Sequence, residues 1–309
     1  MKYKWYKGNI HTHTTKSDGD DTPDSVVKWY RKHDYDFLVL SDHNHLTLLD
    51  YSQGKRHFKR PLMIPGEEVS ANIEIDNQLI PLHINAIGIN RLIEPIYSDS
   101  IISTIQANID NIIEAGGIAS INHPNYKWAF THKELTHIKG ASLLEIYNGH
   151  PTSNNDGGPG KFSTEQIWDF VLSCNKKIFG VATDDSHNYH DFIPSKSNPG
   201  RGWLMVKSDK LAIDKIVESL KLGDFYSSTG VILEEINISN KSIDIKICQE
   251  EQFIYKTQFI GTNGELLATV PGINPFFKLD KNQIYTRATI ISSGGKKAWI
   301  QPVFMDYLF

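Results

Sequence analysis

A change of pattern near residue 230 constrains the fold of this chain most strongly. Before it, short apolar runs alternate with stretches whose apolar residues recur at helical spacing. The runs are 37–40, 61–64, 84–89, 117–121, 143–146 and 178–181, and the helical stretches are 25–33, 101–115, 164–174 and 211–222. Such alternation predicts an α/β fold with a mainly parallel sheet, either open or barrel-like.

Beyond residue 230 the helical patterns stop and strand patterns take over. Residues 242–247 alternate strictly between apolar and polar, and 253–260, 284–291 and 298–305 read as further strands. This pattern predicts a small antiparallel β domain with a sandwich-like form. We therefore predict two domains, 1–230 and 231–309, which a length of 309 residues accommodates.

Composition excludes several classes of protein. The formal net charge is −4, from 32 basic and 36 acidic residues, which argues against long nucleic acid and anionic membranes as partners. The apolar runs are far shorter than the ~20 residues of a membrane helix. Cys174 and Cys248 are the only cysteines, so we expect no disulfide scaffold and a reducing, cytoplasmic location. The chain contains neither a Gly-x-Ser-x-Gly nor a P-loop pattern, and its oligomeric state is left open.

Histidines and carboxylates recur where the predicted strands end. The candidates are His11, His13, Asp18, His43, Glu68, His83, His123, Asp185 and His187. The carboxyl ends of strands in a closed parallel sheet meet at one mouth, so these side chains should converge. Nitrogen and oxygen ligands without thiolate suit Zn, Mn or Fe, and nine ligands indicate two or three divalent ions. Clustered ions of this kind typically hydrolyse phosphoesters.

Several short motifs, taken in order, resemble the PHP (polymerase and histidinol phosphatase) family. They are His11-Thr-His13-Thr-Thr-Lys-Ser-Asp18-Gly, Ser-Asp42-His43-Asn, Pro-Gly-Glu67-Glu68-Val-Ser, His83, His123-Pro and Asp185-Ser-His187. The resemblance covers about residues 5–230. It implies a distorted (β/α)7 barrel with up to three metal ions and, most often, phosphoesterase activity. Residues 5–9 and 225–230 also resemble a subgroup that includes carbaryl-hydrolase-type metallohydrolases.

The resemblance also implies a division of the ligands into a trinuclear centre. The first ion would take His11, His13, Glu68 and Asp185; the second would share Glu68 and add His83 and His123; the third would take Asp18, His43 and His187. Glu68 is preferred to Glu67 because Glu-Val-Ser matches the family's usual ending. Asp42 is expected to orient a ligand imidazole, or to cap the next segment.

The expected reaction is hydrolysis of a small phosphorylated substrate by a hydroxide that bridges two of the ions. Arg201 would hold non-bridging phosphoryl oxygens together with the third ion, because a guanidinium fork suits phosphate. His187 or a metal-bound water would protonate the leaving group. The long loops 150–160 and 187–202 are candidate substrate walls.

Two alternatives use the same centre. The hydroxide could cleave a carbamate, ester or amide, or the domain could be a non-catalytic metal-binding scaffold. Several cationic groups near the metals would favour phosphate, and an apolar aromatic pocket would favour a neutral ester.

Overall fold

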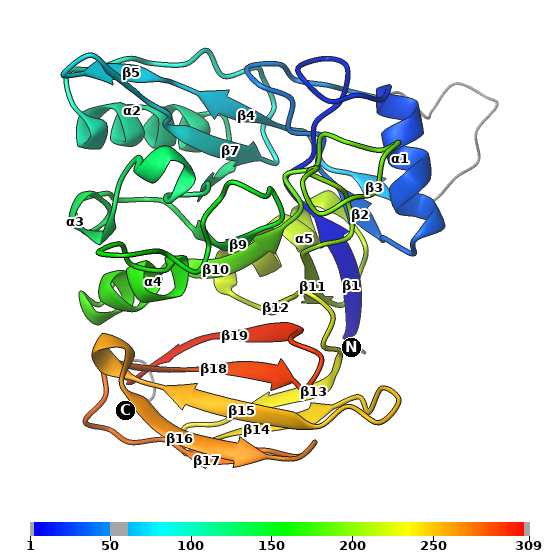
Figure 1. The fold of residues 1–309 in the computed structure, drawn as a ribbon, viewed down its shortest axis with the longest axis vertical. Coiled ribbons are helices and arrows are strands. Elements are labelled where there is room, and N and C mark those ends of the chain that lie inside the picture. Colours follow the sequence, from blue (N-terminus) through cyan, green and yellow to red (C-terminus); the bar gives the residue numbers. More distant parts are fainter. Residues whose placement is uncertain (1–2, 50–60, 306–309) are drawn as a thin grey trace.

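A computed structural model describes residues 3–49 and 61–305 and has two parts, an N-terminal α/β part and a C-terminal β part (Figure 1). The mixed α/β class predicted from the sequence is confirmed. The helices are α1 (Pro23–Lys32), α2 (Ile101–Glu114), α3 (His132–Leu135), α4 (Thr164–Ser173) and α5 (Ile213–Leu222). No helix in the described ranges is long and apolar enough to cross a membrane.

Polar side chains cap the starts of two helices. The Thr22 side chain caps α1, with Pro23 in its first turn. Ser163 and Gln166 form a reciprocal capping box at the start of α4. The sequence did not indicate α3, because four residues are too few to show a helical period.

One sheet runs through both parts of the molecule. Its strand order is β16 (Leu266–Pro271), β15 (Tyr255–Ile260), β18 (Tyr285–Ser292), β19 (Lys297–Phe304), β12 (Phe225–Ser228), β11 (Trp203–Ser208), β1 (Lys4–Asn9), β2 (Phe37–Leu38) and β3 (Leu62–Met63). The pairing of β12 with β19 joins the two parts across residue 230. The predicted boundary lies in the connection that follows β12, but the large sheet continues from β12 into the C-terminal strand β19. The division into domains stays a prediction.

A second sheet belongs to the α/β part. Its order is β10 (Phe179–Thr183), β9 (Leu143–Asn148), β8 (Ile118–Ile121), β7 (His83–Ile87) and β4 (Gly66–Ser70). Between β4 and β7 the chain forms a small hairpin of β5 (Ile73–Ile75) and β6 (Gln78–Ile80).

The expectation of a mainly parallel sheet needs correction. The pairs β1–β2, β2–β3, β8–β9 and β9–β10 are parallel, but β7 runs antiparallel to both β4 and β8. The connection from β4 to β7 holds a hairpin and no crossover helix, so β7 returns in the opposite direction.

The two sheets meet at the end that carries the predicted ligands. Isolated parallel bridges join Thr12 to Ser186 and His43 to Glu68. Within residues 3–49 and 61–305 no ladder of named strands closes the sheets into a barrel. The distorted (β/α)7 barrel therefore stays a prediction.

Apolar residues just below these strand ends form a shared core. Ile10, Val39, Ile87, Leu143 and Val181 come from five neighbouring segments and pack in one buried cluster. This packing fixes the positions of the polar residues that follow. The strand ends are therefore rigid supports for a site.

The C-terminal part consists of two sheets around one core. Strands β13 (Leu233–Ile238), β14 (Ser242–Ile247) and β17 (Phe276–Lys278) form the smaller sheet. The alternating residues Ile243, Ile245 and Ile247 share a buried cluster with Phe259 and Ile290 of the large sheet. The strict alternation of residues 242–247 thus arises because one face of β14 is buried.

Candidate metal centre

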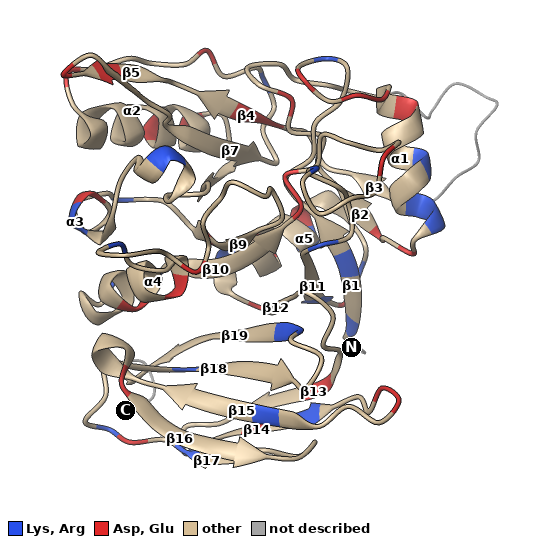
Figure 2. Cartoon of the chain, in the orientation of Figure 1, with Lys and Arg blue, Asp and Glu red and all other residues tan. Residues whose placement is uncertain are grey.

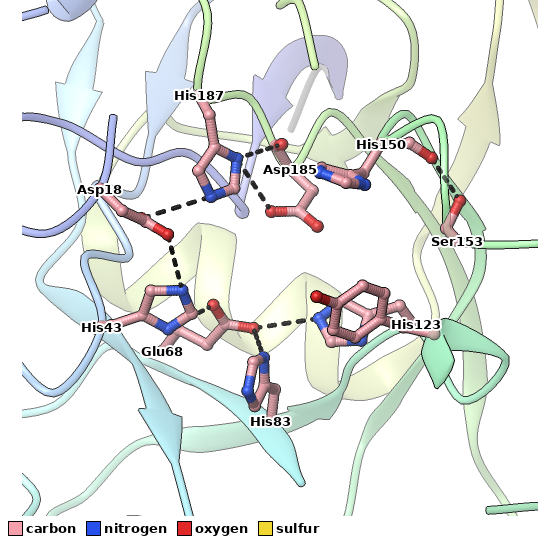
Figure 3. A pocket seen from close by; sticks show the side chains of 10 residues that line it. Asp18, His43, Glu68, His83, His123, His150, Ser153, Asp185 and His187 are labelled. Carbon is pink, nitrogen blue, oxygen red and sulfur yellow. Dashed lines mark hydrogen bonds and ion pairs between the residues drawn. The ribbon is translucent and has the colours of Figure 1, made fainter. Parts of the chain in front are cut away.

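The structure brings all nine predicted ligands together. Seven of them line a cavity of about 220 Å³, with Tyr126, His150 and Ser153 completing the lining: Asp18, His43, Glu68, His83, His123, Asp185 and His187 (Figure 3). His11 and His13 are fully buried beside the same carboxylates. They follow β1 on the segment that forms the bridge at Thr12.

The innermost group joins two histidines and two carboxylates. Asp185 Oδ1 lies 3.2 Å from both His11 Nε2 and His13 Nε2. Glu68 Oε1 lies 3.3 Å from His11 Nε2, and Glu68 Oε2 lies 3.3 Å from His13 Nε2. These are the four residues predicted for the first ion.

Glu68 also faces a second set of imidazoles. Its Oε1 lies 3.2 Å from His83 Nδ1 and 3.3 Å from His123 Nε2, and its Oε2 lies 3.0 Å from His43 Nδ1. His83 and His123 are the residues predicted for the second ion, and His43 belongs to the group predicted for the third. The carboxylate of Glu68 thus lies between the first and second groups, as a bridging ligand would, and also faces a member of the third.

The third group lies at the other end of the cavity, where Asp18 is between His43 and His187 (Figure 3). Asp18 Oδ1 is 3.3 Å from His187 Nε2, and Asp18 Oδ2 is 3.6 Å from His43 Nε2. His13 turns its Nδ1 toward this group, 3.6 Å from Asp18 Oδ1. The Asp18 side chain is 55% exposed, so this group is the most open of the three.

Strand alternation separates the two adjacent glutamates. Glu68 points into the cavity from β4, whereas Glu67 accepts a hydrogen bond from the Ile93 backbone N–H at 2.6 Å. Burial raises the pKa of Glu67 to about 7. Successive residues of a strand face opposite sides, so only one of the pair can reach the cluster.

Without a metal ion, the buried carboxylates and imidazoles of the cluster stabilise one another's charged forms. Burial would raise the pKa of Glu68 and of Asp185, but the adjacent His11 charge outweighs it and holds both pKa values well below the usual range. Burial would likewise lower the pKa of His11, yet Asp185 and Glu68 raise it well above its usual value. The pKa of His83 is lowered, because burial prevails there.

Several buried nitrogens in the cluster lack a hydrogen bond. They are His11 Nε2, His13 Nε2 and His83 Nδ1, and none has a partner of suitable geometry among the described residues. All three lie within 3.3 Å of a Glu68 oxygen. A buried polar atom without a hydrogen-bond partner is energetically costly. A divalent cation placed between these imidazole nitrogens and the carboxylate would accept lone pairs from both. The donor set therefore fits a metal centre.

A supporting carboxylate, Glu145, is not among the site residues predicted from the sequence. Its Oε1 accepts hydrogen bonds from His11 Nδ1 at 2.6 Å and from Thr183 Oγ1 at 2.5 Å. Its Oε2 accepts from the His123 backbone N–H and from Asn148 Nδ2, both at 2.8 Å. Glu145 lies inside the apolar run 143–146 of β9, and a carboxylate within an otherwise apolar strand was the signal that could have identified it.

Two other side chains hold ligands in place. Ser70 Oγ lies 2.6 Å from His43 Nδ1, and Asn122 Nδ2 donates to Glu68 Oε1 at 2.8 Å. Contacts of this kind fix the orientation of metal ligands.

Among the described residues, Asp42 accepts no hydrogen bond from an imidazole, contrary to the main expectation. Its carboxylate accepts hydrogen bonds from the Thr14 N–H at 2.7 Å, from Ser17 Oγ at 2.9 Å and from Thr47 Oγ1 at 2.5 Å. Asp42 therefore holds the turn that leads from His13 to Asp18.

Arg201 is not brought into the cluster. Its guanidinium donates to the carbonyl oxygens of Gly149 (2.8 Å) and Ile193 (3.0 Å) and to Asn198 Oδ1 (3.0 Å). Its backbone N–H donates to Asp184 at 2.7 Å. These hydrogen bonds join two loops, so Arg201 holds the loops together in this structure and does not contact the cluster where phosphoryl oxygens were expected to bind.

His187, the other predicted catalytic residue, does line the cavity. Its Nδ1 donates to the Asp185 carbonyl oxygen at 2.9 Å, which leaves Nε2 facing Asp18. Burial would lower the pKa of His187, but the adjacent Asp18 and Asp185 raise it. Nε2 can hold a metal ion or a proton, but not both at once.

Comparisons with known proteins give a likeness in structure only. The chain matches no protein-family model, and it matches no curated protein. It is similar to a two-domain protein from Bacteroides vulgatus that contains a predicted PHP-like metal-dependent phosphoesterase. The TM-score is 0.52 and the identity 15%, over 97% of this chain and 95% of the other. The two proteins therefore share an overall fold.

Two further solved structures are more distant. A proposed metal-dependent phosphoesterase from Bifidobacterium adolescentis has a TM-score of 0.41 and 14% identity, over 62% of this chain and 89% of the other. An amidohydrolase from Chromobacterium violaceum has a TM-score of 0.38 and 14% identity, over 62% and 93%. TM-scores below 0.5 are too low to indicate a shared fold.

Fold and site together define a class of protein. The chain is a two-part α/β protein that gathers six histidines and three carboxylates at one end of its sheets.

Proposed function

We propose that this protein is a metal-dependent phosphoesterase of the PHP type that acts on a small phosphorylated substrate. One observation carries the proposal: nine nitrogen- and oxygen-bearing side chains converge, and buried imidazole nitrogens among them lack hydrogen-bond partners. The fold shared with the Bacteroides vulgatus protein agrees with it. Membership of the PHP family, and of its carbaryl-hydrolase-type subgroup, belongs to the same proposal.

The proposed cofactors are two or three divalent ions, with Zn, Mn and Fe as candidates. Four overlapping sets of ligand atoms support more than one ion: His13, Asp18, His43 and His187; His11, His13 and Asp185; His11, Glu68 and His123; and His43, Glu68 and His83. When bound, such ions lower the pKa of a coordinated water and neutralise charge on phosphoryl oxygens.

The residues of this chain would supply position and proton control. Glu145 and Ser70 hold the imidazoles of His11 and His43, so the ligand nitrogens face the cavity without rearrangement. His187 Nε2 is the candidate site for the proton that a leaving oxygen needs. In that role His187 would act only while its Nε2 holds no metal ion.

Cleavage of a neutral carbonyl substrate is the second candidate function. Among the described residues that line the 220 Å³ cavity there is neither lysine nor arginine, and Tyr126 is aromatic. No lysine or arginine of the described lining is thus available to hold a phosphate, which favours a carbamate, ester or amide. A non-catalytic scaffold is less well supported, because each predicted ligand is present in the cluster.

A substrate screen tests the proposal. The protein is loaded separately with Mn, Zn or Fe and offered phosphomonoesters, phosphodiesters, and carboxyl and carbamate esters. We expect phosphate release that His13→Ala abolishes and that His137→Ala, an exposed histidine after α3, leaves intact. Turnover of carbonyl esters alone would establish the second candidate. Full phosphoesterase activity in His13→Ala would refute the proposed site.

The cellular setting is also proposed as cytoplasmic. Cys174 and Cys248 are both free thiols, which fits a reducing compartment.

A further inference from the structure

A wide groove adjoins the cavity. It has a volume of about 870 Å³ and shares His150 and Ser153 with the 220 Å³ cavity. Figure 3 shows these two residues across the cavity from Asp18. A ligand whose reacting group lies among the histidines can therefore extend past His150 into the groove, whose size suits a small organic molecule.

The groove walls are held in place by hydrogen bonds. Residues 147–157 form the first wall and residues 192–201 form the second. In the first wall, Asn155 exchanges hydrogen bonds with the backbone of Asn148 at 3.0 and 2.8 Å. The Arg201 guanidinium then joins this wall to the second through the carbonyl oxygens of Gly149 and Ile193. A wall that is ordered before binding loses less entropy when a ligand enters.

The groove has an apolar section on the second wall. Phe192 is 54% exposed and Ile193 is 47% exposed, and both line the groove. Phe192 stacks on Trp29, with ring centroids 6.2 Å apart and an interplanar angle of 17°. A supported aromatic ring that remains half exposed offers contact area to a ligand at low entropic cost.

The C-terminal part contributes a cation to the same groove. Lys296, in the turn between β18 and β19, is exposed and lines the groove. Figure 2 shows basic residues where β19 begins, on the side facing the α/β part. The neighbouring Lys297 pairs with Glu165 at 3.1 Å, whereas Lys296 makes no ion pair among the described residues.

The charge balance of the groove favours an anion. Among the described residues that line the groove, Asp156 is acidic, and Arg201 and Lys296 are basic. Arg201 is occupied by backbone carbonyl oxygens, so the ammonium of Lys296 is the cation that can still meet a ligand.

We propose that this groove binds the leaving group of an elongated phosphoester whose far end carries a second anionic group, and that Lys296 contacts that group. The inference rests on the proposed phosphoesterase function. In the reaction, the bond between phosphorus and the leaving oxygen breaks, a new bond forms to the oxygen of water, and the leaving oxygen takes up a proton. The C-terminal part then has a role in substrate selection.

Matched alkyl substrates test the groove. Metal-loaded protein is given ethyl phosphate, hexyl phosphate and alkanediol bisphosphates of increasing length, and phosphate release gives kcat/KM for each. We expect the kcat/KM of the best bisphosphate to exceed that of the alkyl phosphate of equal length by up to about fivefold, the upper end of the range for an exposed charge pair. Lys296→Gln should remove this preference, and Lys256→Gln, an exposed lysine on β15, should keep it. Phe192→Ala should lower the ratio of hexyl to ethyl phosphate turnover.

A binding measurement separates failure of the groove from failure of the function. Alkanediphosphonates and alkylphosphonates are not hydrolysed, and calorimetry gives their affinities for the wild type and for Lys296→Gln. A diphosphonate preference that depends on Lys296 supports the groove even if no phosphoester is turned over, in which case the function alone is wrong. Equal affinities for the two ligands, or a preference that survives Lys296→Gln, would overturn the groove proposal.

Discussion

His11 Nδ1 lies 2.6 Å from Glu145 Oε1, and both side chains are fully buried. The hydrogen bond fixes the ring of His11 so that its other nitrogen, Nε2, faces Glu68 and Asp185 at 3.3 and 3.2 Å. Glu145 also accepts the backbone N–H of His123, another predicted ligand. One carboxylate outside the cavity lining therefore orients the imidazole of His11 and holds the backbone of His123.

Replacing Glu145 should weaken metal binding without removing a ligand. We expect Glu145→Gln to lower metal affinity by roughly 10- to 100-fold, the usual effect of losing a carboxylate behind a ligand histidine. Titration calorimetry of the metal-free protein measures this change. Glu218→Gln, which removes an exposed carboxylate from α5, is the matched control. Equal affinities in the wild type and Glu145→Gln would show that Glu145 does not position His11.

Arg201→Ala separates a loop-joining role from direct contact with substrate. The side chain bonds Gly149, Ile193 and Asn198, so its loss should destabilise the protein by about 1–3 kcal/mol. The looser groove should raise KM more than it lowers kcat. Urea unfolding and steady-state kinetics together measure both effects. A loss of kcat of about 100-fold with unchanged stability would instead indicate an oxyanion contact.

Metal removal should destabilise the protein, and more so at high pH. The raised pKa of His11 contributes stability to the metal-free protein below its unfolded value of 6.5, and this stability is lost as the pH rises through the folded pKa. Metal binding strengthens over the same range, because the ligands must lose protons to bind. The difference in melting temperature between metal-loaded and chelator-treated protein should therefore be larger at about pH 8 than at about pH 6. A difference that shrinks with pH would contradict metal binding by these histidines.

An ion pair between the two parts of the molecule should dominate the stability of their contact. Arg287 of β18 is 1% exposed and donates to both Asp169 carboxylate oxygens of α4 at 2.7 Å. Arg287→Met would leave Asp169 buried and charged, so we expect a loss of about 3–5 kcal/mol.

Urea unfolding of Arg287→Met and of Arg287→Met with Asp169→Asn checks this expectation. The second change removes the uncompensated charge, so the double variant should recover part of the loss. A single variant within about 1 kcal/mol of the wild type would show that the pair contributes little.

Local sequence patterns predicted the parts of the fold that local rules determine. Strict alternation in residues 242–247 corresponds to β14, and the helical spacing of residues 164–174 corresponds to α4. The direction of β7 was missed, although Asp76 and Asn77 held the signal. Both residues have positive φ, 50° and 60°, as in the tight turn of a two-residue hairpin.

In the site, too, the sequence predicted some residues and missed the contacts of others. The nine candidate ligands converge because each lies near a strand end and carries a chemically distinctive side chain. The partners of Glu145 and Arg201 depend on strand register and on how two loops pass one another, which spacing in the sequence does not determine. Their supporting contacts therefore emerged only from the structure.

Anomalous diffraction from crystals of the metal-loaded protein, recorded at the absorption edge of the added metal, tests the metal centre most directly. We expect two or three peaks, each within coordination distance of ligand atoms from the groups around Asp185, Glu68 and Asp18. Crystals soaked in excess metal that show no peak among these residues, or peaks only elsewhere on the protein, would contradict a metal-dependent hydrolase.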